Sequence, residues 1–493
     1  IGVRIMEKQQ DKGFFGQPRG LSTLFFTEMW ERFSYYGMRA LLLYYMYDAV
    51  TSGGLGLPKQ TALSIMSLYG ALVYMTSIIG GWVSDRVLGA KRTVFIGGVF
   101  IMFGHIVLAT PFGVGALFTS MALIITGTAF LKPNVSGMVG HLYSKDDLRR
   151  DAGFSIFYMG VNLGALLAPL IVGTLGQEYN YHLGFSLAAF GMFFGLLQYV
   201  IQGRKTLDGI GMTPPNPLES EERKKLIRNL VIAVVIIAAI FGIAQVTGYL
   251  TFEFFLNVTT VLGIVLPIFY FIKMLTSKDV APEEKPKVIA YIPLFLAASV
   301  FWSLQEQGSS ILALFADERT NNTLFGMTIQ PSWYQSLNPI FIFMLTPIFV
   351  TMWTKLGKRQ PSTVVKFSLG LLFAGLSFLL LMMPGVLFGT DGKVSPLWLL
   401  GSFFIVVIAE LCLSPVGLSV TTRLAPRAFE SQTVAIWFLA DASSQVINAQ
   451  IARFYTPATE SAYFGIVGIV AIIGGVLLFL LKEPIKKMMG NVN

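Results

Sequence analysis

Long apolar segments recur along the whole chain and are separated by short polar loops. A helix that crosses the hydrocarbon core of a bilayer needs about 20 predominantly apolar residues. Fourteen segments reach this length. They lie near residues 18–48, 60–83, 92–110, 115–141, 151–175, 183–202, 227–247, 250–273, 288–316, 332–354, 362–384, 396–422, 428–453 and 461–482. The pattern predicts an all-α polytopic membrane protein with these 14 segments as transmembrane helices.

Two polar linkers divide the predicted helices into groups of six, two and six. The first linker, near residues 203–228, is rich in proline and charge, and the second runs from Lys278 to Lys287. We therefore predict an N-terminal six-helix bundle over residues 1–203 and a C-terminal six-helix bundle over residues 288–493. Residues 204–287 would form a linker and an inserted transmembrane hairpin. Paired bundles around a site at the midplane are typical of secondary transporters.

Composition and the distribution of charge agree with a membrane protein. Hydrophobic residues make up 54% of the chain and charged residues 13%, whereas soluble domains carry about 25% charged residues. If the N-terminus is cytoplasmic, cytoplasmic segments hold 29 of the 36 Lys and Arg residues and outer segments hold 4, as the positive-inside rule requires. Both termini are then cytoplasmic. The net charge of +9 faces anionic lipid, so the bilayer and not nucleic acid is the expected partner.

The first span contains a cluster of charge that a passive membrane anchor would not carry. Glu28, Glu31 and Arg32 lie within five positions, and each charge near a bilayer centre costs about 2.5 to 3.5 kcal/mol. One helical face, at spacing i, i+4, i+7 and i+11, consists of Glu28, Arg32, Tyr35 and Arg39. The cluster could be a self-neutralising ion pair between helices. Arg39 has no acid near it in its own helix, so it requires a partner from another helix or a ligand carboxylate.

Motifs in both halves of the chain carry a family resemblance. Residues 80–92 resemble the loop motif G-x-x-x-D-R-x-x-G-x-(R/K)-(R/K) of the major facilitator superfamily, and residues 28–32 read Glu-x-x-Glu-Arg. Further matching segments are residues 127–134, 154–164, 301–307, 335–339 and 409–415. Together they resemble the proton-dependent oligopeptide transporter family within that superfamily. The resemblance implies the major facilitator fold, and the short outer loops favour a bacterial member in the inner (plasma) membrane.

The resemblance also implies roles for individual residues. Proton coupling would involve Glu28, Glu31, Arg32 and Glu306. Arg39 and Lys132 would bind the peptide carboxylate, whereas Asn162, Asn338 and Glu410 would bind its amino terminus. Side-chain pockets would be formed by Tyr35, Tyr36, Tyr74, Tyr158, Trp302 and Trp437, although such aromatics commonly only pack helices. Ser414, four residues after Glu410, could orient that carboxylate or bond its own helix backbone.

The charges within the predicted spans fit a ligand that carries both signs. The acids Glu28, Glu31, Glu306 and Glu410 and the bases Arg32, Arg39 and Lys132 sum to −1 when all are ionised. One bound proton neutralises this set, and a peptide zwitterion adds no net charge. Asp441 and Glu253 are further acids within spans; Asp441 could line the cavity, and Glu253 lies near a helix end. We expect a proton-coupled symporter that imports di- and tripeptides by alternating access between the bundles.

Other functions remain as alternatives. The sequence has no zinc-protease, nucleophile-elbow or Walker motif, so we expect no enzyme, and no cofactor beyond a driving proton gradient. Cys412 is the single cysteine and no metal site is expected. A channel would require rings of like charge. A carrier of nitrate or another small solute, or a drug exporter of the same superfamily, is the nearer alternative. One chain supplies both bundles, so we expect a functional monomer.

Overall fold

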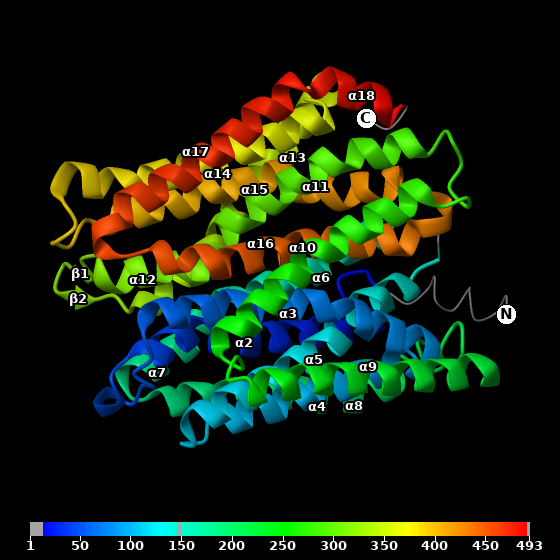
Figure 1. Ribbon diagram of the computed structural model, residues 1–493, viewed down its shortest axis with the longest axis horizontal. Helices are drawn as coiled ribbons and strands as arrows, with labels where there is room; N and C mark the ends of the chain where they lie inside the picture. The colour runs from blue at the N-terminus through cyan, green and yellow to red at the C-terminus, as the bar shows by residue number, and fades with distance from the viewer. Residues whose placement is uncertain (1–12, 145–146, 148, 491–493) are drawn as a thin grey trace.

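The computed structural model describes residues 13–144, 147 and 149–490, and long helices dominate it. Figure 1 shows these helices running side by side, with the β1–β2 hairpin at one end of the molecule and α18 at the other. We call these the hairpin end and the α18 end.

The N-terminal bundle contains six long helices and one short one. Its elements are α2 (Arg19–Tyr47), α3 (Lys59–Val83), α4 (Ala90–Leu108), α5 (Gly113–His141), α6 (Arg150–Ala168), α7 (Thr174–Glu178) and α8 (Tyr181–Thr206). Two further helices follow, α9 (Ser220–Val246) and α10 (Phe252–Thr276).

The C-terminal bundle occupies the rest of the chain. Its elements are α11 (Lys285–Glu306), α12 (Ile311–Glu318), β1 (Thr323–Leu324), β2 (Met327–Thr328), α13 (Leu337–Leu356), α14 (Thr363–Phe388), α15 (Pro396–Leu424), α16 (Glu430–Ile451), α17 (Glu460–Leu480) and α18 (Lys482–Met489). Short 3₁₀ segments span Val50–Ser52, Gln307–Ser309, Pro331–Ser336, Gly357–Arg359, Arg427–Phe429, Ala452–Phe454 and Pro457–Thr459, and π-helical segments span Ser84–Leu88 and Pro169–Gly173.

Each of the 14 predicted spans corresponds to a long helix or to a helix continued through a short break. Within the described residues, twelve spans are long and apolar enough to cross a membrane by length and composition. α2 and α16 are not among those twelve, because charged and amide side chains interrupt their apolar surface. Both helices lie at the centre of the molecule, where such side chains are shielded from lipid.

Two predicted spans are broken, and both breaks lie close to the interface between the bundles. Pro169 opens the π-helical segment between α6 and α7, since proline cannot donate a backbone hydrogen bond. The break between α11 and α12 follows directly after Glu306, and Ser310 there leaves helical geometry with φ −124° and ψ −88°. Interrupted helices free backbone groups at the depth where transporters bind their ligands.

Close helix packing depends on glycine at the crossing points. A Cβ atom on Gly97 of α4 would lie 2.6 Å from the carbonyl oxygen of Gly127 on α5. A Cβ atom on Gly375 of α14 would lie 2.6 Å from the carbonyl oxygen of Gly468 on α17. Small residues at such crossings let backbones approach closely, which is how helices associate in a bilayer.

The inserted pair α9 and α10 differs from both bundles. Among the described side chains of α9, Ala244 is the one that is buried. The remaining apolar surface of α9 is exposed and suited to lipid. α10 packs on α16, where the Ser443 hydroxyl donates to the carbonyl oxygen of Gly263 over 2.7 Å. The helix α9 begins at Ser220 and not near residue 227, because Glu219 and Glu222 form a capping box that satisfies its first backbone N–H groups.

Polar contacts between the two bundles gather at the hairpin end and the middle. At the hairpin end, Tyr47 donates to Asp317 over 2.5 Å and the Trp333 indole donates to Thr174 over 2.7 Å. Nearer the middle, Ser64 of α3 donates to the carbonyl oxygen of Ala449 on α16 over 2.7 Å. The bundles are therefore closed against each other toward the hairpin end.

Candidate functional site

A cavity of about 480 Å³ lies between the bundles, within the usual size of small-ligand pockets. Side chains of α2, α3, α5 and α6 line it from the N-terminal bundle, and side chains of α11, α13, α15 and α16 line it from the C-terminal bundle. The lining extends along α5 to Ser136 and along α15 to Leu418, which lie toward the α18 end. The cavity thus runs from the middle of the molecule toward the end where the bundles share fewer polar contacts.

The structure brings most of the predicted site residues to this one cavity. Fourteen of the sixteen line it: Glu28, Arg32, Tyr36, Arg39, Tyr74, Lys132, Tyr158, Asn162, Trp302, Glu306, Asn338, Glu410, Ser414 and Trp437. Glu31 and Tyr35 are buried behind the cavity wall, 0% and 3% exposed. Tyr35 packs instead against Tyr69. The Arg32 guanidinium carbon lies over the Tyr35 ring, 4.8 Å from the centroid of that ring.

The charged cluster of α2 neutralises itself in part. Arg32 donates from Nη2 to Glu31 Oε1 over 2.7 Å and from Nε to Glu31 Oε2. Glu28 Oε1 lies 3.5 Å from the same Nε atom. Glu28 Oε2 is buried without a hydrogen-bond partner. The cluster was considered as an ion pair between helices, but the contacts of Arg32 with Glu31 and Glu28 lie within α2, and one carboxylate oxygen of Glu28 remains without a partner.

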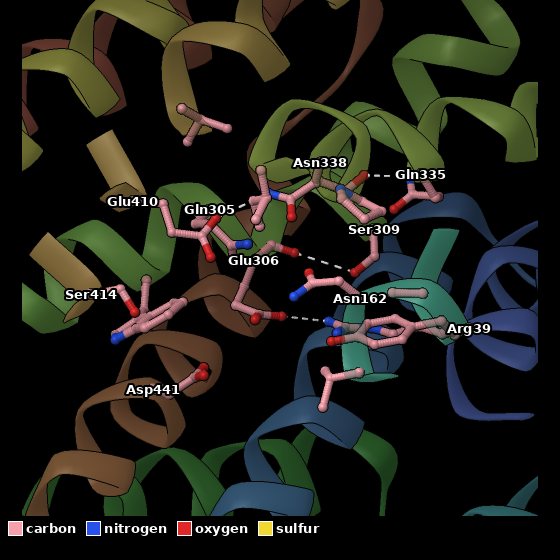
Figure 2. A pocket seen from close by; sticks show the side chains of 18 of the residues that line it. Arg39, Asn162, Gln305, Glu306, Ser309, Gln335, Asn338, Glu410, Ser414 and Asp441 are labelled. Carbon is pink, nitrogen blue, oxygen red and sulfur yellow. Dashed lines mark hydrogen bonds and ion pairs between the residues drawn. The ribbon is translucent and has the colours of Figure 1, made fainter. Parts of the chain in front are cut away.

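Of the two partners expected for Arg39, another helix or a ligand carboxylate, the structure shows the first, and that helix belongs to the other bundle. Arg39 Nη2 lies 2.6 Å from Glu306 Oε2. Gln445 Nε2 of α16 donates to the same oxygen over 2.7 Å, and Arg39 Nε has no partner. Both charged side chains are less than a tenth exposed. The ion pair is therefore a direct electrostatic link between the bundles at the cavity wall (Figure 2).

Lys132 reaches the cavity from α5 without a neighbouring carboxylate at ion-pair distance. Its ammonium lies 4.4 Å from the centroid of the Tyr74 ring, a cation–π contact. The charges that act on it belong to Arg32, Asp441, Glu28 and Glu31. Among the described residues, no salt bridge to Lys132 is found, so this cation is available to a ligand.

The opposite side of the cavity presents an acid and amide groups. Asn338 Nδ2 of α13 donates to Glu410 Oε2 of α15 over 3.1 Å. Asn338 therefore helps to orient Glu410, and among the described residues no hydrogen bond from Ser414 to Glu410 is found. Asn162 Nδ2 donates to the backbone oxygen of Tyr158 in its own helix over 3.0 Å. Figure 2 places Glu410 and Ser414 across the view from Arg39 and Asn162, with Glu306 between them.

Several polar lining residues were absent from the predicted site. They include Gln305, Ser309 and Gln335. Asp441, which was named above as a possible lining residue without an assigned role, does line the cavity. A signal for Asp441 is present in the sequence, because polar residues recur along one face of α16 at Asp441, Gln445 and Asn448. Ser309 belongs to the helix break, whose position depends on tertiary packing and not on local hydropathy.

The two bundles and their central charged cavity define the class: a membrane transporter with the major facilitator fold. A solved structure described as a peptide transporter POT in complex with sulfate superposes with a TM-score of 0.96 at 56% identity, over 99% of both chains. An uncharacterised transporter of Bacillus subtilis (strain 168) is 56% identical over 99% of this chain and 98% of its own length. A di-/tripeptide transporter of Lactococcus lactis subsp. cremoris is 55% identical over 98% of both.

The family assignment follows from a direct match. Residues 91–470 match the sequence model of the POT family. The chain therefore belongs to the POT family, which confirms the resemblance read from its motifs and its all-α membrane fold.

Proposed function

We propose that this protein is a proton-coupled symporter that imports di- and tripeptides. The observation that carries the proposal is a single cavity with opposite charges on its two sides. Arg39 and Lys132 supply cations from the N-terminal bundle, and Glu410, held by Asn338, supplies an anion from the C-terminal bundle. Charge-assisted hydrogen bonds of this kind suit the carboxylate and the ammonium of a short peptide. The Lactococcus relative is itself described as a di-/tripeptide transporter.

The link between proton and peptide would be the Arg39–Glu306 ion pair. Protonation of Glu306 removes its charge and weakens the 2.6 Å contact with Arg39. Arg39 is then free to bind the peptide carboxylate, and the bundles lose a direct connection. A proton would thereby change both ligand affinity and the equilibrium between conformations. Glu28, with its unpartnered oxygen, would be a second point at which the α2 cluster senses protonation.

The direction of transport follows from the proposed orientation. If the α18 end is cytoplasmic, as the distribution of Lys and Arg predicts, the cavity faces the cytoplasm. Alternating access would require the hairpin end to open and the α18 end to close.

Uptake into liposomes tests the proposal directly. Purified protein should accumulate di- and tripeptides when the external solution is made acidic, and a protonophore should abolish the accumulation. A panel of one to four residues should define the accepted length. Absence of uptake, or uptake that ignores the protonophore, would overturn the proposal; nitrate uptake in its place would support the small-solute alternative.

A further inference from the structure

Asp441 is a buried acid of the cavity that the proposed coupling mechanism does not use. It lies on α16, its residue is 5% exposed, and its Oδ1 atom has no hydrogen-bond partner. Figure 2 shows its carboxylate on the side of the cavity that also carries Ser414. Burial of an ionised carboxylate with one unsatisfied oxygen is costly, so either a counter-ion or a proton must compensate its charge.

The groups that face Asp441 come from four helices. Tyr74 of α3, Lys132 of α5, Arg39 of α2 and Glu306 of α11 all interact with its charge. Arg39 is already engaged by Glu306. Lys132 lines the same cavity as Asp441, lies over the Tyr74 ring and has no ion pair among the described residues. α15, which also packs on α16, contributes Glu410 to the same cavity, and that carboxylate is held by Asn338. Lys132 is therefore the natural counter-ion of Asp441.

The net charge of the site shows how many protons are needed to neutralise it when a peptide is bound. The acids are Glu28, Glu31, Glu306, Glu410 and Asp441, and the bases are Arg32, Arg39 and Lys132. Five acids and three bases sum to −2 when all are ionised, and a zwitterionic peptide leaves that sum unchanged. Two protons, and not one, make the loaded site neutral.

We propose that Lys132 compensates the charge of Asp441 across the empty cavity, and that Asp441 takes up a second proton when a peptide carboxylate binds Lys132. The first proton is the one on Glu306. The second moves from a hydronium ion in the cavity to the Asp441 carboxylate, which becomes neutral, and a water molecule remains. The second proton returns to water once the peptide has left and Lys132 again compensates Asp441. This inference rests on the proposed peptide symport.

The physical reason is competition for one cation. The peptide carboxylate and the Asp441 carboxylate cannot both be neutralised by a single ammonium group. Asp441 is buried, and a shielded site disfavours the charged form of a carboxyl group once its cation is engaged elsewhere. The carboxylate that loses Lys132 is therefore the one that binds the proton. A residue that merely packed α16 against α3 would not respond to the charge of the ligand.

The wild-type protein provides the first test, without any substitution. In proteoliposomes with a fixed peptide gradient, the voltage at which net flux stops reports the number of protons moved per peptide. A dipeptide with a free carboxylate should move two protons. The same dipeptide with an amidated C-terminus leaves Lys132 with Asp441 and should move one. Equal numbers for the two ligands would overturn the inference.

The variant Asp441→Asn provides the second test. With the free-carboxylate dipeptide, its proton number should fall from two to one, while Asp441→Glu should keep two. The exposed loop acid Asp391 gives a matched control, Asp391→Asn, with the wild-type number. An unchanged number in Asp441→Asn contradicts the inference. If Asp441→Asn does not fold, as judged by gel filtration, the comparison of the two wild-type ligands decides the matter.

Binding measurements in detergent test whether the effect of Asp441 on peptide affinity acts through Lys132. Asp441→Asn should bind the free-carboxylate dipeptide several-fold more tightly than wild type and the amidated dipeptide equally well. In a Lys132→Gln background the gain should vanish. An equal gain for both dipeptides, or a gain that persists in Lys132→Gln, would assign Asp441 a structural role only. Failure of the wild type to bind either dipeptide would instead contradict the proposed function.

Discussion

Two buried arginine–glutamate pairs in this protein have similar exposure and different surroundings. Arg39–Glu306 has side chains 8% and 9% exposed, and Arg319–Glu460 has side chains 7% and 1% exposed. Arg319 Nε contacts both oxygens of Glu460, at 2.9 and 3.1 Å, and its Nη2 donates to the Gly389 carbonyl over 2.8 Å. Arg39 contacts one oxygen of Glu306 and shares that oxygen with Gln445.

The difference lies in what each pair connects. Arg319 and Glu460 both belong to the C-terminal bundle, where they join the end of α12 to the start of α17 and to the segment after α14. Arg39 and Glu306 belong to different bundles and line the cavity. A pair inside one bundle can stay closed throughout alternating access, whereas a pair between bundles must open if the bundles move. Under the proposed coupling mechanism, we expect the pair within one bundle to serve rigidity and the pair between bundles to serve switching.

The largest expected effect is on stability, from Arg319→Met. Removing one partner leaves the Glu460 carboxylate buried without compensation, which costs about 3 to 5 kcal/mol. We expect a large loss of folded protein and of thermal stability in detergent, measured by fluorescence-detected gel filtration after heating. The control is Arg453→Met, whose pair with Glu253 is 39% and 68% exposed; it should cost no more than about 1 kcal/mol. Equal losses in the two variants would contradict the structural role of Arg319.

The second prediction concerns the Arg39–Glu306 pair and uses the variant Glu306→Gln. The amide keeps a hydrogen-bond acceptor for Arg39 but cannot change its charge. We expect folding and peptide exchange to persist, while accumulation driven by a proton gradient is lost. Counterflow and gradient-driven uptake in the same liposomes measure the two activities, with Glu253→Gln as the exposed control. Gradient-driven accumulation by Glu306→Gln would remove Glu306 from the coupling mechanism.

A third prediction distinguishes the ligand role of Arg39 from its pairing role. Arg39→Ala removes a hydrogen-bond donor to a charged group, worth about 1.5 to 3 kcal/mol. Binding of a free-carboxylate dipeptide should therefore weaken about 10- to 100-fold, while an amidated dipeptide loses less. The measurement is a titration of each dipeptide in detergent, with the exposed Arg359→Ala as control. The same loss for both dipeptides would mean that Arg39 acts only through Glu306.

The two pairs also show what could be predicted from sequence. Apolar length and charge placement are local signals, so the amino-acid order alone locates the helices and the charged face of α2. Arg39 could be recognised as a cation that needs a distant partner. That the partner is Glu306, and not Glu410, depends on how the bundles face each other, and no local pattern contains that information.

Arg319 shows the limit from the other side. Arg319 follows the predicted span 288–316 and is one of the four basic residues counted in the outer segments, where hydropathy alone treats a cation as solvated. Its burial depends on Glu460, 141 positions away, and on a backbone carbonyl after α14. Asp441 lies between these cases. Its place within a predicted span indicated a possible cavity residue, but only the fold brings it to the same cavity as Lys132.

The smallest expected effect comes from a third ion pair. This pair tests whether burial, or location between the bundles, is what switching requires. Lys59 and Glu318 form a salt bridge between the bundles at the hairpin end, with side chains 45% and 29% exposed. This pair shares its location between bundles with Arg39–Glu306, but it is in contact with water. Lys59→Gln should change stability by no more than about 1 kcal/mol, and the difference should vanish in about 1 M salt because exposed charges are screened.

Thermal unfolding of Lys59→Gln and wild type at low and high salt measures this difference. Gradient-driven uptake should persist in the variant, since water already solvates both charges whether the pair is open or closed. If Lys59→Gln abolished coupling as Glu306→Gln is expected to do, location between the bundles would be sufficient for switching. If Lys59→Gln retains coupling, location between the bundles is not sufficient. Shielding from water is then the reason why protonation of Glu306 changes the free energy of the Arg39–Glu306 pair enough to move the bundles.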